Sequence, residues 1–374
     1  MSFCNLRRPS LRLAGPLVLC LAASLVAAEE QTPSGASWKF AISGDSRNCG
    51  NIVMPAIAAG VLADGASFYW HLGDYRAIYM VDEDYARIFP QTSITDYQNN
   101  AWPDFIKHQL GPFGSLPVFL AVGNHELIQP KTRDAIIVQF ADWFDAPVIR
   151  QQRLADDPND HLVKTYYHWI DRGIDFINLD NAGPDQFTDA QVAWFNAEIA
   201  RAAANPAIHT VVVGMHAALP DSLSAGHSMN DSPQEQVTGR AAYKALVDLR
   251  SKTGKNVYVM ASHSHYVMNN IYDTACHSDG NVLPGWIVGS AGAVRYRLPN
   301  DLGKSTVHQT DEYGYVLATV APDYTISFEF KPVEEKNVPE TVRTEFGADG
   351  VRWCFQQNKS PYQVGGPTCP ITCQ

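Results

Sequence analysis

The sequence predicts an α/β layer fold whose C-terminal half is rich in β-strands. Short runs of β-branched and aromatic residues recur along the chain, and a polar or glycine-rich turn follows each of them. Segments with the apolar spacing of helices separate several of these runs. Strands that alternate with helices are typical of proteins in which helices cover a largely parallel sheet.

The predicted elements follow one another in a regular order. Six segments are predicted as strands: WKFAIS (38–43), SFYWHL (67–72), LPVFLAV (116–122), IDFINLD (174–180), HTVVVGM (209–215) and NVYVMAS (256–262). The segment 188–204 is predicted as a helix in which Thr188 and Gln191 form a capping box. A second helix is predicted over 239–254 and ends at Gly254.

The segments outside this pattern are assigned by their composition. Residues 127–165 hold one helix-like piece and a polar loop, which is typical of an insertion. From Gly285 onward β-rich runs follow one another without a helix, so the sheet is expected to finish with antiparallel strands. We predict one large domain over 37–330 and a C-terminal extension over 331–374, a tail of little pattern that disulfides pin to the domain.

Residues 1–28 are predicted to be a secretory signal peptide. Arg7, Arg8 and Arg12 precede an apolar run that is too short to span a membrane and that ends at small residues suited to cleavage after Ala28. The alternative, an uncleaved membrane anchor, is disfavoured by this length. The mature protein is therefore expected to be secreted or periplasmic and to have no membrane span.

The charge of the chain limits the classes of binding partner that are expected, and its cysteine content bears on the cellular compartment. The chain carries 28 basic and 39 acidic residues, so binding to nucleic acid is not expected. Removal of the predicted signal peptide leaves five cysteines, and well-placed pairs are expected to oxidise in an exported protein. The pairings that the sequence leaves open are Cys354 with Cys369 or Cys373, and Cys49 with Cys276.

Side chains that bind metals follow five of the predicted strands, where the functional edge of an α/β sheet lies. In chain order they are Asp45, Asp74, Asn124 with His125, His216, and His263 with His265. Carboxylates, an amide oxygen and imidazoles together suit divalent ions such as Mn, Fe, Zn or Ni. Each residue alone is also explained as a turn residue, a helix cap or a hydrogen-bonded histidine. Their occurrence in order after predicted strands indicates a metal centre.

This series of motifs resembles that of the calcineurin-like metallophosphoesterase family, to which the purple acid phosphatases are distantly related. The resemblance covers about residues 38–330 and implies a four-layer α/β/β/α sandwich with two divalent metal ions at the strand ends. It implies that Asp74 bridges the ions and that His125 protonates the leaving oxygen or contacts the phosphoryl group, while the metals activate water for attack on phosphorus. The other implied ligands are Asn124, His216 and His263 for one ion, and Asp45 and His265 for the other.

Two departures from the family motifs concern Arg47 and Ala77. Arg47 stands where the first motif has a histidine ligand, and a guanidinium cannot bind a metal. Purple acid phosphatases supply a tyrosine three residues after the second aspartate instead, and Ala77 stands at that position. One ion therefore lacks a protein ligand. Arg47 is interpreted either as a clamp for the phosphoryl group or as an ion-pair partner of Asp45 or Asp74.

The sequence is interpreted as an exported metal-dependent phosphohydrolase that cleaves phosphomonoester or phosphodiester bonds of a small molecule. Arg47 and His227 are the residues expected to contact this substrate. Two other interpretations are a catalytically impaired protein of the same fold that binds a phosphorylated ligand or a protein partner, and a metal-binding structural or scavenging module. Arg47 and Ala77 favour the first of these. The pair Asn124 and His125 disfavours both, because a binding protein needs no acid beside its metal.

Overall fold

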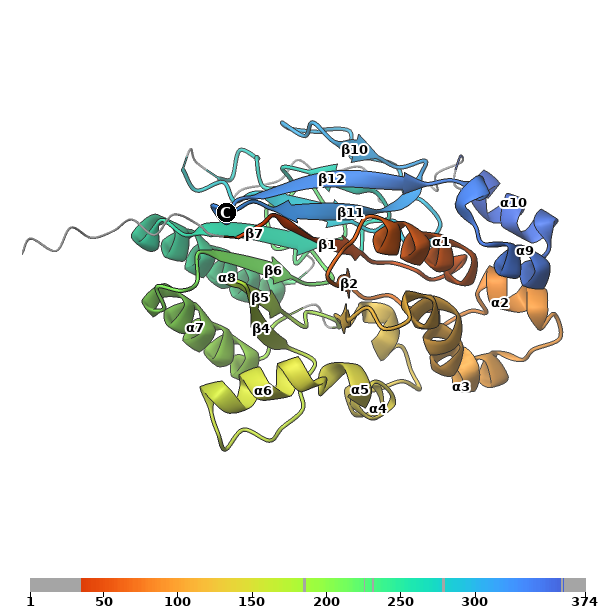
Figure 1. Cartoon of the computed structure of the whole chain (residues 1–374), viewed down its shortest axis with the longest axis horizontal. Helices are drawn as coiled ribbons and strands as arrows, with labels where there is room; N and C mark the ends of the chain where they lie inside the picture. Colours follow the sequence, from red (N-terminus) through yellow and green to blue (C-terminus); the bar gives the residue numbers. More distant parts are fainter. Residues whose placement is uncertain are drawn as a thin grey trace, which may run out of the picture. The chain divides into compact units, whose positions relative to one another are not determined.

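A computed structural model describes residues 35–357 except 184–185, 225, 231 and 278–279, together with Lys359. These residues form a mixed α/β fold with two β-sheets, which confirms the predicted fold class (Figure 1). The predicted signal peptide and residues 360–374, with Cys369 and Cys373, lie outside the described residues.

The first sheet has five strands in the order β12-β11-β1-β2-β3, and the second has seven in the order β10-β8-β9-β7-β6-β5-β4. The first sheet consists of β1 (Trp38–Ser43), β2 (Tyr69–His71), β3 (Val118–Leu120), β11 (Tyr313–Val320) and β12 (Ile326–Val333). The second consists of β4 (Tyr167–Asp171), β5 (Ile174–Asn178), β6 (Thr210–Gly214), β7 (Asn256–Ala261), β8 (Val267–Asn269), β9 (Gly285–Val288) and β10 (His308–Gln309).

The helices lie between and after these strands. The α-helices are α1 (Gly50–Ala63), α2 (Glu83–Ile88), α3 (Ile94–Phe105), α4 (Arg133–Gln139), α5 (Ala141–Phe144), α6 (Pro147–Asp156), α7 (Asp189–Ala204), α8 (Pro233–Thr253), α9 (Glu340–Phe346) and α10 (Ala348–Gln357). Short π- or 3₁₀-helical segments are η1 (Ile106–Leu110), η2 (Gly111–Phe113), η3 (Asn124–Leu127) and η4 (Glu335–Asn337).

The strands place alternate side chains in different layers, because successive residues of a strand point to opposite faces of its sheet. Ile42 of β1 and Val212 of β6 belong to one apolar core, which lies between the two sheets. Val211 and Val213 belong to a second core, formed with α7 and α8. Ala41 belongs to a third core, formed with α1. Helices therefore cover the outer face of each sheet, and the layer order is α/β/β/α.

The predicted antiparallel finish of the sheet is confirmed, because β11 pairs antiparallel with both β1 and β12. The start of α8 was predicted too late. The helix begins at Pro233 rather than at residue 239, since Ser232 and Glu235 form a capping box there. In α7, the Thr188 hydroxyl accepts from the backbone N–H of Gln191 as predicted. The Gln191 side chain instead bonds the backbone of Asp180, so the reciprocal half of that box is not made.

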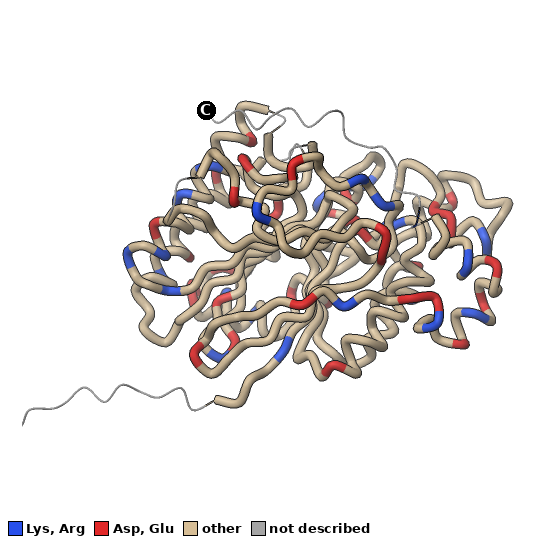
Figure 2. Tube along the Cα trace, turned by 90° about the horizontal axis from the view of Figure 1, so that it is seen from above, with Lys and Arg blue, Asp and Glu red and all other residues tan. Residues whose placement is uncertain are grey.

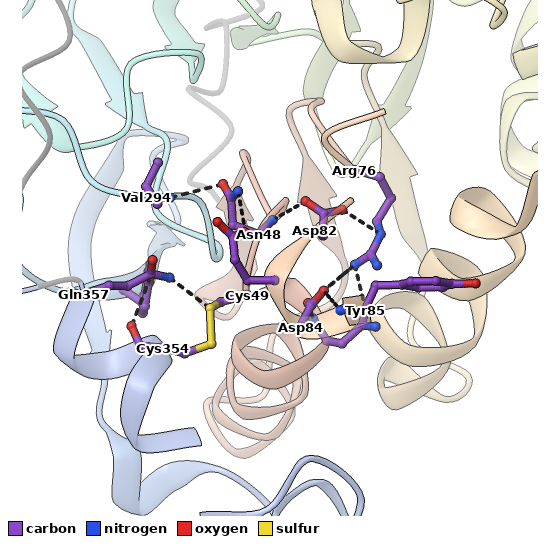
Figure 3. Close-up of a disulfide and its surroundings, with 12 residues drawn as sticks. Asn48, Cys49, Arg76, Asp82, Asp84, Tyr85, Val294, Cys354 and Gln357 are labelled. Carbon is purple, nitrogen blue, oxygen red and sulfur yellow. Dashed lines mark hydrogen bonds and ion pairs between the residues drawn. A yellow bond between two sulfur atoms is a disulfide. The ribbon is translucent and has the colours of Figure 1, made fainter. Parts of the chain in front are cut away.

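The segment after residue 330 is joined to the domain by a disulfide, as predicted, but it is more regular than predicted. Instead of a tail of little pattern, it continues β12 to Val333 and then forms α9 and α10. Phe346 and Val351 pack in the core that contains α1. Cys49 forms a disulfide with Cys354, so none of the predicted pairings that involve these two cysteines is made (Figure 3). The two cysteines are 305 positions apart, and only the packing of α10 near α1 brings them together.

Charged residues of both signs are interspersed along the described trace (Figure 2). Among the described helices, none combines the length and apolar character that a membrane crossing requires.

A buried ionic cluster joins the β4–β5 hairpin to two helices. His168 Nδ1 lies 2.8 Å from Asp175 Oδ1, and His168 Nε2 lies 2.6 Å from Asp156 Oδ2 and 3.1 Å from Glu198 Oε2. Burial opposes the charged form of His168, but hydrogen bonds to Asp156 and Asp175 raise its pKa to about 10. His168 is therefore a charged link between α6, β5 and α7 at neutral pH.

We predict that His168→Gln lowers the free energy of unfolding by about 3 kcal/mol at pH 6, because it leaves the buried carboxylate of Asp175 without the cation that faces it. Since the folded-state pKa of His168 is raised above its ordinary value, this contribution is complete below about pH 6.5 and is lost as the pH rises toward 10. Urea denaturation of the wild type and the variant from pH 6 to 10 measures the difference. The exposed His161, changed to Gln, serves as control. A difference that stays constant across this range would contradict the charged state of His168.

Candidate metal centre

The predicted site residues meet where the carboxyl ends of parallel strands from both sheets converge. Strands β1, β2 and β3 pair parallel in one sheet, and β5, β6 and β7 pair parallel in the other. Ligand atoms of Asp74, His216 and His263 lie within 4.8 Å of one another, as do those of Asp45, Asp74 and His265. The two groups share Asp74. We call the first group, together with Asn124, site A, and the second group site B.

The backbone has a left-handed conformation at three of the site residues. Asp45, Asp74 and His263 all have positive φ values, of 60°, 60° and 63°. Few residues other than glycine adopt this conformation without a local reason, and such residues cluster at functional sites. A Cβ on Gly123 would lie 2.3 Å from Asp74 Oδ1, so the third strand can approach this carboxylate only with glycine at that position.

Site A gathers atoms that accept hydrogen bonds. His216 Nδ1 donates to the backbone oxygen of Leu72 at 2.8 Å, so in the neutral ring Nε2 carries a lone pair. This Nε2 lies 3.1 Å from Asn124 Oδ1, 3.3 Å from Asp74 Oδ1 and 2.9 Å from His263 Nδ1. Lone pairs of an imidazole, an amide and a carboxylate therefore face one another. A divalent cation between them fits this donor set.

Site B gathers acceptors too, but a cation of the protein lies beside them. His265 Nδ1 donates to the backbone oxygen of Val294 at 2.6 Å, which leaves Nε2 as the acceptor, and this Nε2 lies 3.3 Å from Asp45 Oδ1. Arg47 Nη2 lies 3.2 Å from the same Nε2, and Arg47 Nε lies 3.7 Å from Asp74 Oδ2. The guanidinium thus faces His265 and Asp74 together.

The two carboxylates give the centre a negative charge. Asp45 and Asp74 are fully buried, and neither Asp45 Oδ1 nor Asp74 Oδ2 receives a hydrogen bond from the described part of the chain. Burial raises the pKa of Asp45 to about 6. Burial also opposes ionisation of Asp74, but His125, His216 and Arg47 hold its pKa below the usual range. Orphaned buried carboxylate oxygens of this kind fit a metal centre, because a buried charge requires a counter-charge.

His125 and His227 lie beside the centre. His125 Nδ1 donates to the backbone oxygen of Ala77 at 2.7 Å, and Nε2 lies 3.7 Å from Asp74 Oδ2. Burial lowers the pKa of His125, although Asp74 opposes this effect. The ring of His227 lies 4.9 Å from that of His263 and 5.0 Å from that of Tyr296. All the predicted site residues are therefore brought to one place.

Three residues of the centre were not assigned a role by the sequence analysis. Glu126 accepts backbone hydrogen bonds from Gly123, Asp74 and Tyr75, each at 2.8 Å, and so fixes the loop after β2. The Tyr296 ring stacks on His265 at 3.8 Å, and its hydroxyl accepts from Arg47 at 3.1 Å. The Ser262 hydroxyl lies 3.1 Å from His216 Nδ1. Glu126 directly follows the predicted pair Asn124 and His125 in the sequence, whereas nothing near Tyr296 in the sequence marked it.

A buried salt-bridge cluster holds the segment that follows Arg47 and begins at Asn48 (Figure 3). Arg76 pairs with Asp82, Asp84 and Asp104 at 3.0, 3.2 and 3.1 Å. Asp82 Oδ1 in turn accepts from the backbone N–H of Asn48 at 2.7 Å, and Asp84 Oδ2 accepts from that of Asn51 at 2.7 Å. The Cys49–Cys354 disulfide fixes the same segment from the other side. The segment that directly follows Arg47 is therefore fixed by both the aspartates and the disulfide.

No family model matches the chain, and no curated protein matches it in sequence. The purple acid phosphatase PPD1 from yellow lupin (Lupinus luteus) has a TM-score of 0.55 at 18% identity, over 80% of this chain and 52% of that one. The chain has the fold of this phosphatase. It spans about half of that protein's length.

Two further solved structures were found with weaker similarity. GAP50 of Plasmodium, described as the anchor in the inner membrane complex, has a TM-score of 0.49 at 12% identity, over 84% of this chain and 95% of that one. PhoD has a TM-score of 0.49 at 12% identity, over 86% of this chain and 77% of that one.

We predict that Mn²⁺ raises the melting temperature of the wild type by several degrees, because an ion at a thousandfold excess over its Kd adds about 4 kcal/mol to the folded state. His216→Ala removes a nitrogen at the centre of site A and should abolish most of this rise. His209→Ala, an exposed histidine just before the start of β6, is the matched control and should keep it. Differential scanning fluorimetry with and without Mn²⁺ gives the comparison. An equal rise in both variants would place the ion elsewhere.

Proposed function

We propose that this protein is a metal-dependent phosphohydrolase of the calcineurin-like metallophosphoesterase family. The observation that carries the proposal is site A. There, at the strand ends, Asn124 Oδ1 and Asp74 Oδ1 lie within 3.3 Å of His216 Nε2. The α/β/β/α fold and the order of the motifs in the sequence support it. The substrate is a phosphomonoester or phosphodiester of a small molecule.

The proposed ligands of the site A ion are Asp74, Asn124, His216 and His263. Such an ion, when bound, acts as a Lewis acid on a phosphoryl oxygen. Hydrogen bonds orient these ligands: Leu72 O fixes the tautomer of His216, and the backbone N–H of His263 donates to Asp45 Oδ2 at 2.8 Å. Ligands that are oriented in this way lose little freedom when they bind a metal.

His125 is proposed as the general acid. Water attacks phosphorus, the bond from phosphorus to the leaving oxygen breaks, and that oxygen takes up a proton. Ala77 O accepts from Nδ1 of His125, so the ring presents Nε2 to the centre, at 3.7 Å from Asp74 Oδ2. Burial lowers the pKa of His125, and the carboxylate of Asp74 opposes this effect by favouring the imidazolium. Arg47 and His227 line the same space and are proposed to contact the phosphoryl group.

A second function is favoured by one observation, the guanidinium of Arg47 in site B. A protein of this fold that has lost part of its metal centre can bind a phosphorylated ligand without turnover. Turnover separates the two functions, because a binding protein releases its ligand unchanged.

Export is also proposed. The predicted signal peptide supports it, and so does the Cys49–Cys354 disulfide, since disulfides persist in oxidising compartments.

We predict that the purified protein hydrolyses p-nitrophenyl phosphate and a simple alkyl phosphate with Mn²⁺ and loses this activity with EDTA. His125→Asn should lower turnover of the alkyl ester by about 10²–10⁴. The loss should be smaller for the nitrophenyl ester, because its leaving oxygen needs no proton. His161→Asn, an exposed histidine, is the control and should not change either rate. Equal losses for both esters would count against the acid role, and absence of turnover with every metal tested would favour the binding protein.

A further inference from the structure

We propose that the guanidinium of Arg47 takes the place of a second metal ion in site B, so that the centre binds one divalent ion per chain. The inference rests on the proposed function in one respect, namely that site A holds an ion. It concerns metal stoichiometry, and it can be tested without an assay of turnover.

The guanidinium and a metal ion would compete for the same lone pair. His265 has one acceptor nitrogen, Nε2, because Nδ1 donates to Val294 O at 2.6 Å. Arg47 Nη2 lies 3.2 Å from this Nε2, at the distance of a hydrogen bond. An imidazole bound to a divalent ion such as Zn²⁺ holds it at about 2.0–2.1 Å along that lone pair. The nitrogen cannot serve both, so site B accepts an ion only if Arg47 leaves.

The surroundings hold Arg47 in this position. Its Nη2 also donates to the hydroxyl of Tyr296 at 3.1 Å, and the Tyr296 ring stacks on His265 at 3.8 Å. The side chain of Arg47 is only 7% exposed. The next residue, Asn48, is fixed through its backbone N–H by Asp82 and through its side chain by Glu83, at 2.7 and 2.8 Å. Displacement of Arg47 would therefore break several buried contacts.

The two sites differ in the charge of the groups that face the acceptor nitrogen of their histidine. In site A, within the described chain, His216 Nε2 faces Asn124 Oδ1, His263 Nδ1 and Asp74 Oδ1, none of which is a permanent cation. In site B, the corresponding atom, His265 Nε2, faces a guanidinium that is always charged. The structure thus supplies the counter-charge of site B itself and leaves that of site A to a metal.

The charge balance agrees with one ion. Asp45 and Asp74 contribute two negative charges, Arg47 one positive charge and a single divalent ion two, so the buried centre carries a small net positive charge that suits an anionic phosphoryl group. A second divalent ion would add two positive charges close to a buried guanidinium, and like charges in a poorly solvated site repel strongly.

The test is metal stoichiometry after equilibrium dialysis against Mn²⁺, measured by elemental analysis on the full mature chain. The wild type should bind one ion, and Arg47→Lys, which retains a positive charge, should also bind one. Arg47→His should bind two, because it removes the competing cation and adds an imidazole ligand. Arg47→Ala should bind a second ion more weakly through Asp45, Asp74 and His265. Circular dichroism checks that each variant is folded.

Electron paramagnetic resonance of the same samples gives a second readout. Mn²⁺ in the wild type should give the spectrum of an isolated ion, whereas Arg47→His should show exchange coupling between two ions that share Asp74. Two ions in the wild type would overturn the inference, and so would a single ion in both Arg47→His and Arg47→Ala. Failure of the phosphatase assay would leave these outcomes unchanged. Loss of the proposed function and loss of this inference are therefore distinguishable.

Discussion

The arrangement of the centre follows from one constraint, the compensation of two carboxylates that have no contact with solvent. Asp45 and Asp74 end neighbouring parallel strands of the first sheet, and both are fully buried. A buried charge is costly unless opposite charge and hydrogen bonds surround it. The second sheet supplies imidazoles, with His216 facing Asp74 and His265 facing Asp45, each at 3.3 Å. Arg47 supplies a permanent positive charge. The groups that compensate this negative charge thus join the two sheets at the carboxyl ends of their strands.

A second buried network keeps these groups in register. Arg76 is surrounded by three aspartates, and two of them bond the backbone of the segment that follows Arg47. Glu126 does the same for the loop after β2, through three backbone N–H groups. Buried polar networks with satisfied partners give rigidity rather than large net stability. Their consequence here is that Arg47 and the proposed metal ligands have little freedom to rearrange, which favours retention of the guanidinium in site B.

The sequence predicted the parts of this structure that depend on local pattern. The strand ends and the polar residues that follow them could be predicted, because apolar β-rich runs come just before Asp45, Asp74 and His263. Contacts between segments that are distant in the sequence could not be predicted. Arg47 is 218 positions from His265 and 249 from Tyr296, and no local signal indicates that these three side chains meet. The Cys49–Cys354 bond and helices α9 and α10 were missed for the same reason, because they depend on packing against α1, which is distant in the sequence.

The most direct measurement of the central claim is a crystal structure of the mature protein grown with excess Mn²⁺, with an anomalous difference map. One metal peak should lie among Asp74, Asn124, His216 and His263, and the Arg47 guanidinium should remain within hydrogen-bonding distance of His265 Nε2. Two peaks bridged by Asp74, with Arg47 displaced from His265, would contradict the claim that this chain supplies its own second cation.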